Sequence, residues 1–168
     1  MHPTPAKSAE AARSAERKFL TFMLGKASYG IDVLKTREII RLVDITAVPR
    51  MPDYVKGVIN LRGRIIPVID LRLRFALANA DATERTCIVV VQVSLPGNLA
   101  LQMGLIVDAV EEVINLPDAD IEPPPNFGAQ VTTDAILGMA KVRDSVKTLL
   151  DIDKVLATDS LANFQAGF

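Results

Sequence analysis

The chain has 168 residues, of which 49% are hydrophobic and 23% are charged. This composition excludes global disorder, and the length suits one ordinary domain or two small packed barrels. The net charge of −1 argues against wholesale electrostatic attraction to nucleic acid or to an anionic membrane.

The N-terminal segment, residues 1–17, is rich in Ala, Ser and charged residues and lacks the apolar run of a signal peptide. We expect it to form a flexible tail. The residues from Lys18 to Leu24 then predict a first strand. Gly25 and Lys26 predict a turn into a second strand over residues 28–32.

The next segment has a different periodicity. Apolar and small residues between Val33 and Ile40 lie at helical spacing, which predicts a short helix. Residues 42–43 and 45–48 predict another pair of strands. Prolines at positions 49 and 52 end this pair because proline cannot donate a backbone hydrogen bond.

A β-hairpin is predicted over Gly57–Asp70, because two apolar runs surround Arg62-Gly63 and glycine tolerates the positive φ of a tight turn. Arg62 should lie at the exposed tip. Its guanidinium is then either solvated or available to a partner's carboxylates. Pro67 cannot donate to the strand ladder, so the second strand should lie at a sheet edge or carry a bulge there.

Residues 71–77 predict a helical turn, and the small polar residues that follow predict a boundary between two halves at 76–85. The second half continues as short strands separated by turns, at 86–93, 99–107, 110–116, 135–142 and 146–151. Helical turns are predicted at 117–121 and 152–156, an extended connector at the prolines 123–125, and a tail at 158–168. Many short strands and little helix predict an all-β fold of two packed five-stranded barrels.

The residues needed for common catalytic chemistry are missing. Cys87 is the only cysteine and His2 the only histidine, which excludes the usual Cys/His and Ser/His nucleophile arrangements. A single free thiol favours a reducing compartment. Asp118, Asp120 and Glu122 alternate like metal ligands, but neither a histidine nor a calcium-binding glycine loop completes a site. We therefore expect a protein that is not an enzyme and holds neither a metal nor another cofactor.

A membrane span is a further alternative, because Thr86–Val107 carries no charge over a length that crosses a bilayer as a helix. The turn residues at 95–98 divide this segment. Two buried strands therefore fit better than direct membrane insertion.

Nucleic-acid binding is suggested by four arginines, at positions 62, 64, 72 and 74. Single-strand binders stack bases on aromatic rings, and only Tyr54 and Phe75 lie near these arginines. Between Leu34 and Arg74 the chain has nine Lys/Arg and four Asp/Glu, against ten and sixteen in the remainder. This uneven distribution suits contacts with different protein partners better than contact with one polyanion.

Four motifs together resemble the CheW adaptor family of bacterial chemotaxis. They are YGIDV at Tyr29–Val33, the pair Glu38-Ile39, NLRGRIIPVIDLR at Asn60–Arg72 and IEPPPNF at Ile121–Phe127. The resemblance covers nearly the whole chain, and it predicts a CheW-like domain over residues 18–157. It implies two SH3-like barrels, with an edge strand crossing between them.

The resemblance also implies a non-catalytic adaptor that couples methyl-accepting chemoreceptors to the CheA histidine kinase. Its expected location is the cytoplasm, where it is recruited to membrane-associated receptor arrays. Adaptors of the same kind also serve surface or twitching motility, and that pathway stays an alternative.

By the same resemblance, Glu38, Gly57 and Arg62 bind the receptor tip, and Val43 and Ile45 bind the regulatory domain of the kinase. A structural reading stands beside each of these roles. Without the resemblance, Glu38 is read as a solvated helix residue and Gly57 as a backbone requirement, where a Cβ would clash. Val43 and Ile45 fit the core as well as an interface.

Overall fold

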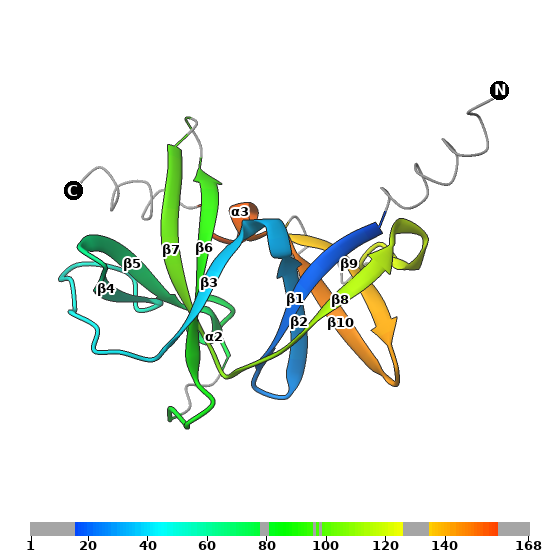
Figure 1. The fold of residues 1–168 in the computed structure, drawn as a ribbon, viewed down its shortest axis with the longest axis horizontal. Coiled ribbons are helices and arrows are strands. Elements are labelled where there is room, and N and C mark those ends of the chain that lie inside the picture. The colour runs from blue at the N-terminus through cyan, green and yellow to red at the C-terminus, as the bar shows by residue number, and fades with distance from the viewer. Residues whose placement is uncertain (1–15, 78–80, 96, 98, 126–134, 158–168) are drawn as a thin grey trace.

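The computed structural model describes residues 16–77, 81–95, 97, 99–125 and 135–157 (Figure 1). The tails predicted at 1–17 and 158–168 lie outside the described residues, except for Glu16 and Arg17, which begin the first strand. In Figure 1 one sheet lies on the right of the molecule and the other on the left.

The first sheet has five strands. Their spatial order is β8 (Ala109–Pro117), β1 (Glu16–Leu24), β2 (Ala27–Asp32), β10 (Ser145–Leu150) and β9 (Ile136–Val142). All neighbours in this sheet are antiparallel except β2 and β10, which are parallel. Figure 1 shows the blue β1–β2 pair beside the orange β9–β10 pair.

The second sheet also has five strands. Their order is β3 (Thr36–Arg41), β6 (Cys87–Leu95), β7 (Leu99–Val107), β5 (Arg64–Asp70) and β4 (Val55–Leu61). Only β5 and β7 are parallel. The prediction of an all-β fold with two packed five-stranded barrels is confirmed.

The helices are short and connect strands. They are η1 (Val33–Lys35), α2 (Leu71–Arg74), η2 (Asp118–Asp120) and α3 (Ile152–Val155). Aspartates cap three of them, because the carboxylate of Asp32, Asp70 or Asp151 accepts a hydrogen bond from a backbone N–H of the first turn. The predicted helical turns at 71–77, 117–121 and 152–156 therefore correspond to α2, η2 and α3.

The chain divides between the sheets at places other than the predicted break. Residues 76–85 connect α2 to β6, and β6 belongs to the same sheet as β3, β4 and β5. The predicted boundary therefore lies within the second sheet. The chain passes from the first sheet to the second at η1 and returns between β7 and β8. Local composition carries no information on strand pairing.

Two local predictions between Val33 and Val48 are wrong. The helix predicted over 33–40 is limited to the single turn η1, and residues 36–41 form β3, whose side chains alternate in burial. β-Branched residues at 36, 39 and 40 favour the strand, and β6 supplies its hydrogen-bonding partner. The strands predicted at 42–43 and 45–48 are absent, and this segment makes a single isolated bridge, between Thr46 and Val58.

The predicted hairpin is formed by β4 and β5, and Arg62 and Gly63 have φ values of 52° and 86° at its tip. Asn60 Oδ1 accepts a hydrogen bond from the Gly63 backbone N–H at 2.8 Å. β5 is not an edge strand, since it pairs with β7 as well as β4. Its pairing with β7 covers only Val68–Asp70, so Pro67 lies just outside that ladder. The irregularity of the hairpin is in β4, between Val55 and Gly57.

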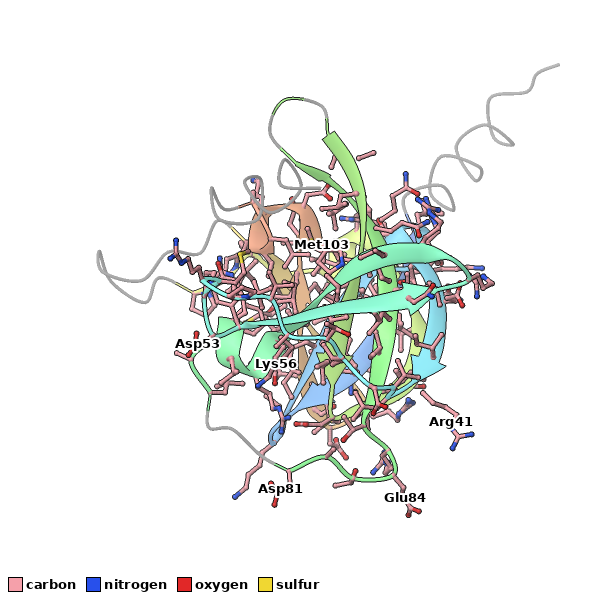
Figure 2. The ribbon with its side chains drawn as sticks, turned by 90° about the vertical axis from the view of Figure 1, so that its left-hand side faces the viewer. Arg41, Asp53, Lys56, Asp81, Glu84 and Met103 are labelled. Atoms are coloured by element: carbon pink, nitrogen blue, oxygen red, sulfur yellow. The ribbon has the colours of Figure 1, made fainter. Side chains whose placement is uncertain are left out.

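Three groups of buried apolar side chains form the core. One lies within each sheet, around Ile114 in the first and Ile66 in the second. The third group joins the sheets and contains residues of both, among them Leu20, Phe22, Ile31, Val89, Met103 and Leu105. Met103 lies among the packed side chains of Figure 2, whereas Arg41 and Glu84 point outward. The two barrels therefore share a continuous apolar interface.

Candidate functional site

Arg62 and Glu38 form an exposed ion pair. Arg62 Nη1 donates a hydrogen bond to Glu38 Oε1 at 3.0 Å, and Nη2 donates to Oε2, so the contact is bidentate. Glu38 is on β3, and Arg62 is at the tip of the hairpin that includes β4. Since β3 and β4 are opposite edges of the second sheet, the pair joins the two sides of its open seam.

The electrostatics of this pair keep both partners charged. The hydrogen bond from Arg62 lowers the pKa of the Glu38 carboxyl below its usual value, and the same contact raises the pKa of Arg62. A carboxylate with a lowered folded-state pKa stabilises the fold above its unfolded pKa and loses that contribution as the pH falls through the folded value. The pair is therefore intact at neutral pH.

Two exposed aliphatic side chains lie close in sequence to the ion pair. Ile39 follows Glu38 on β3, and Ile65 lies three residues after Arg62 on β5. Glu38 and Ile39 are successive residues of β3 and therefore point to opposite faces of that strand, and Ile39 lines a hollow beside Cys87. We call the surface formed by Glu38 and Arg62 the Arg62 face.

Gly57 is buried and acts through its backbone. Its φ is +143°, and a Cβ at this position would lie 1.9 Å from the carbonyl oxygen of Thr46. Thr46 and Val58 exchange two backbone hydrogen bonds, of 2.9 and 2.8 Å. Gly57 therefore permits residues 42–48 to cross β4 at close range. It presents no side chain to a partner.

Val43 and Ile45 differ in exposure. The Val43 side chain is exposed, whereas Ile45 is half-buried and packs against the core of the second sheet. Both line a hollow of about 300 Å³, together with Lys56, Arg72 and Thr86. The alternation in the sequence did not distinguish the outward residue from the inward one, because the segment is not a strand.

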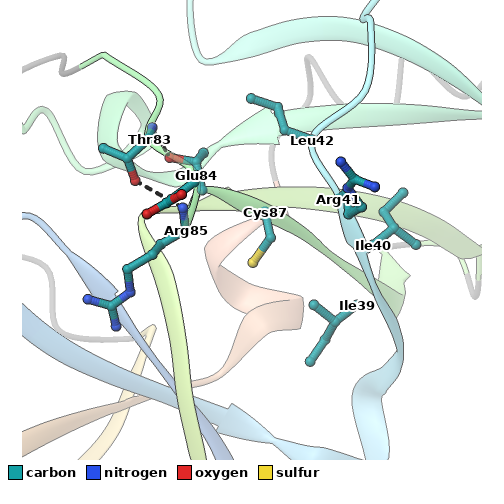
Figure 3. Close-up of a pocket in the computed structure, with 9 residues that line it drawn as sticks. Ile39, Ile40, Arg41, Leu42, Thr83, Glu84, Arg85 and Cys87 are labelled. Carbon is teal, nitrogen blue, oxygen red and sulfur yellow. Dashed lines mark hydrogen bonds between the residues drawn. The ribbon is translucent and has the colours of Figure 1, made fainter.

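A second hollow of about 370 Å³ adjoins the first and shares Leu42 and Thr86 with it. Figure 3 shows the 83–86 loop on one side, residues 39–42 on the other and Cys87 between them. Burial raises the pKa of the Cys87 thiol, which keeps it protonated and weakly nucleophilic.

The four arginines at positions 62, 64, 72 and 74, which suggest a basic surface in the sequence, do not form one surface in the structure. Arg62 and Arg64 are exposed, but Arg72 is buried, and Arg74 Nε donates to the Val155 carbonyl oxygen at 3.1 Å. Arg74 also stacks over the ring of Tyr54. The basic surface required by the nucleic-acid alternative is therefore absent from this part of the described chain.

Arg72 connects the two sheets, a role that sequence reasoning missed. Its Nη1 lies 3.0 Å from Asp108 Oδ1, and Asp108 Oδ2 accepts a hydrogen bond of 2.6 Å from the Gly25 backbone N–H. Neither Arg72 Nη1 nor Nε makes a well-aligned hydrogen bond, so the contact with Asp108 is electrostatic. No sequence signal separated Arg72 from its exposed neighbours.

Among the described residues, no group of three or more His, Cys, Asp or Glu side chains is placed to hold a metal ion. The acids Asp118, Asp120 and Glu122 are exposed, on and just after η2. Across the same residues, no helix is long and apolar enough to cross a membrane.

Residues 18–160 match the model of the CheW-like domain. The chain is 35% identical over 152 residues to the chemotaxis protein CheW of Klebsiella aerogenes, and the match covers 90% of this chain and 89% of that relative. It is 28% identical over 156 residues to protein FrzA of Myxococcus xanthus, covering 92% and 94% of the two chains.

Among solved structures, the fold is similar to that of the scaffolding protein TtCheW from Thermoanaerobacter tengcongensis. The TM-score is 0.74 and the identity 35%, and the match covers 86% of this chain and 90% of that one. The matched domain, the sequence relatives and the shared arrangement of two five-stranded sheets all agree. The chain therefore belongs to the CheW-like domain family.

Proposed function

We propose that this chain, a coupling adaptor of bacterial chemotaxis, joins the cytoplasmic tips of methyl-accepting receptors to a CheA-type histidine kinase. The observation that carries the proposal is the exposed, bidentate Glu38–Arg62 ion pair on a member of the CheW-like family. The adaptor works by binding alone, in the cytoplasm, and is recruited to receptor arrays at the membrane.

The proposed receptor site is the Arg62 face, with Gly57 acting indirectly. Arg62 has donors beyond those that hold Glu38, and its exposed guanidinium can reach a carboxylate of a partner. Ile65, exposed on β5 of the same hairpin, offers apolar area to a helical tip. Gly57 contributes by holding residues 46–47 against β4, which fixes the hairpin that carries Arg62.

The proposed kinase site is the segment that contains Val43 and Ile45. Val43 is exposed for contact with the regulatory domain of the kinase, and half-buried Ile45 anchors the segment to the barrel. The adjoining hollow, with Lys56 at its rim, adds a concave surface for a partner side chain. A few such anchors suffice for most of the binding energy of an interface.

The receptor site is tested with Arg62→Glu in a reconstituted complex of receptor, kinase and adaptor. We expect receptor-stimulated autophosphorylation of the kinase to fall by about tenfold, because an anchor residue reverses its charge. The double variant Glu38→Arg, Arg62→Glu restores an ion pair in reversed order. It should not restore activity if Arg62 contacts the receptor directly.

Arg64→Glu, on the same hairpin, is the matched control and should retain stimulation. The kinase site is tested with Val43→Asp, which should abolish co-elution with the kinase regulatory domain while receptor binding persists. Leu34→Asp changes another exposed aliphatic side chain and is the control, so it should still co-elute with that domain. Normal receptor-stimulated activity with Arg62→Glu contradicts the proposed receptor site.

A second candidate pathway is surface or twitching motility, which uses adaptors of the same kind. The similarity to protein FrzA of Myxococcus xanthus is the observation that keeps it open. A deletion strain distinguishes the two, since loss of swimming toward soluble attractants indicates chemotaxis, whereas loss of surface movement alone indicates the other pathway.

A further inference from the structure

The hollow of about 300 Å³ beside residues 42–45 lies at one end of the second barrel. Lys56 is the second residue of β4, Asp70 is the last of β5, and Ile106 is next to the last of β7. Since β4 is antiparallel to β5 and β5 is parallel to β7, these positions meet at the same end of the sheet. Arg72 of α2 also lines this space, which we call the Arg72 hollow. The mouths of β-barrels are frequent ligand sites.

Arg72 brings to this hollow a buried cation whose donors lack acceptors. Its side chain is only 5% exposed, and neither Nε nor Nη1 has a hydrogen-bond partner among the described residues. Nη1 lies 3.0 Å from Asp108 Oδ1 without the alignment of a hydrogen bond, and Nε lies 3.7 Å from Asp70 Oδ1. A buried N–H group without an acceptor loses its hydration and gains nothing in return, which is costly on a charged side chain. Two donors of Arg72 therefore call for acceptors that these carboxylates do not supply.

The two neighbouring carboxylates are engaged by backbone donors. Asp70 Oδ1 accepts hydrogen bonds from the N–H groups of Arg72 and Leu73, at 2.9 and 3.4 Å, and so caps α2. Asp108 Oδ2 accepts a hydrogen bond of 2.6 Å from the Gly25 N–H. Both carboxylates lower the electrostatic cost of burying Arg72, but their hydrogen bonds serve the backbone. The acceptors that Arg72 lacks can therefore come from a molecule that enters the hollow.

Two further donors line the same hollow. Lys56 is half-buried, and its ammonium group has no ion pair or hydrogen bond with any residue that the structure describes. Thr86 is buried, and its Oγ1 accepts a hydrogen bond of 2.8 Å from the Thr83 N–H, which leaves the hydroxyl proton free to donate. Asp44 is the remaining charged residue of the lining, and it is exposed at the rim. The inner lining of the hollow therefore has more free donors than free acceptors.

We propose that the Arg72 hollow binds a small oxyanion, a phosphate or carboxylate group held by Arg72, Lys56 and Thr86. Water brings donors of its own into the hollow, whereas an oxyanion brings several acceptors and a negative charge in one rigid group. The volume is at the lower limit for ligand pockets, which restricts the ligand to a small molecule. Val43 and Ile45 line the same hollow, but the oxyanion site does not depend on the proposed kinase site, because its donors hold the ligand without a partner protein.

The charges around the hollow set a modest affinity. Asp44 repels an anion from the rim, and the half-buried position of Lys56 leaves its attraction partly screened by solvent. We expect a dissociation constant on the order of 1 mM for a small oxyanion, from a few charge-assisted hydrogen bonds in an open site. A ligand concentration of about 10 mM should then raise the folding equilibrium constant about tenfold by linkage.

The test follows the amide chemical shifts of the full chain during titration with sodium phosphate or sodium acetate, with sodium chloride at matched ionic strength as the reference. We expect saturable shifts at the amides of residues 43–45 and 86. Saturation by phosphate alone identifies a phosphate ligand, saturation by acetate alone a carboxylate ligand, and either supports the site.

The variants change charges at the rim, because Arg72 also contacts Asp108 and its replacement disturbs the fold. Lys56→Gln should weaken binding about tenfold, since it removes a charged donor. Asp44→Asn should strengthen binding about threefold, since it removes a repelling charge. Lys141→Gln, at an exposed position of β9, makes the same charge change as Lys56→Gln and should leave the affinity unchanged.

Two outcomes would overturn the oxyanion site. Shifts that rise without saturation and equally with phosphate, acetate and chloride show that the hollow holds water only. Saturable binding that both Lys56→Gln and Asp44→Asn leave unchanged places the anion elsewhere on the chain. Neither outcome affects the proposed function, because receptor and kinase binding are measured with other variants.

Discussion

At the scale of single residues, Gly57 shows how a backbone position can govern a binding surface. The Thr46 carbonyl oxygen occupies the space that a Cβ would need, and two backbone hydrogen bonds hold Thr46 to Val58. A side chain at position 57 must therefore displace the segment that leads to Val43. Effects of changes at Gly57 on partner binding would then be indirect.

Gly57→Ala should lower the free energy of unfolding by about 3 kcal/mol, because the strained φ and the clash with Thr46 add together. Denaturant unfolding measures this loss, and hydrogen exchange at the Val58 amide should report that the bridge to Thr46 has opened. Gly25→Ala is the control, since its φ is also positive but nothing lies within 4 Å. That variant should cost about 1 kcal/mol, and equal losses for the two variants would refute the steric explanation.

Arg62 and Glu38 differ in how far the sequence predicted their place in the structure. The Arg62-Gly63 dipeptide predicted a hairpin tip with positive φ and an exposed guanidinium, and both features are present. Glu38 was assigned only through family resemblance. Its ion pair joins residues 24 positions apart on opposite edges of a sheet, and local spacing carries no information on that contact.

At the scale of elements, the connections between the sheets depend on a buried charge. Asp108, between β7 and β8, contacts Arg72 of α2 and accepts a hydrogen bond from the Gly25 N–H in the β1–β2 turn. Three elements thus meet at one carboxylate. This cluster fixes how α2 of the second sheet lies against the first sheet.

Asp108→Asn should lower the free energy of unfolding by about 3 kcal/mol, because it leaves the buried Arg72 guanidinium without its closest counter-charge. Asn keeps an acceptor for Gly25, so the variant tests the charge rather than the hydrogen bond. Asp144→Asn, in the exposed β9–β10 turn, is the matched control and should change stability by less than about 0.5 kcal/mol. Equal stability of the two variants would show that Arg72 is neutralised elsewhere.

Elements with strong local signals were predicted well. The β1–β2, β4–β5 and β9–β10 pairs all have glycine or charged turn residues between apolar runs, and each appears at the expected place. The helix prediction for residues 36–40 is wrong because a short apolar segment fits both periodicities. The strand forms because β6 offers unpaired backbone groups beside it.

At the scale of the whole molecule, strand exchange makes each barrel dependent on both halves of the chain. The first sheet takes β1 and β2 from one half and β8, β9 and β10 from the other. The shared core cluster joins the sheets further, and Tyr29 of β2 stacks on Phe75, which follows α2. Neither barrel has a complete core without the other half.

We expect a single cooperative unfolding transition for this reason. Native-state hydrogen exchange at Leu20 in the first sheet and Ile69 in the second should give the same free energy of opening, because both sites open only on global unfolding. Circular dichroism and tyrosine fluorescence should give coincident denaturation curves. Two separate transitions would show that the barrels are independent units.

The amino-acid order was enough to predict the all-β class, the positions of most turns and the exposed arginine at the hairpin tip. Turn chemistry and alternation are local, so the order of residues states them directly. The three-dimensional structure was needed for three features: the division of each half's strands between the two sheets, the burial of Arg72, and the contact of Arg62 with Glu38. These features depend on which distant strands pair, and pairing is set by the packing of the complete core rather than by any one segment.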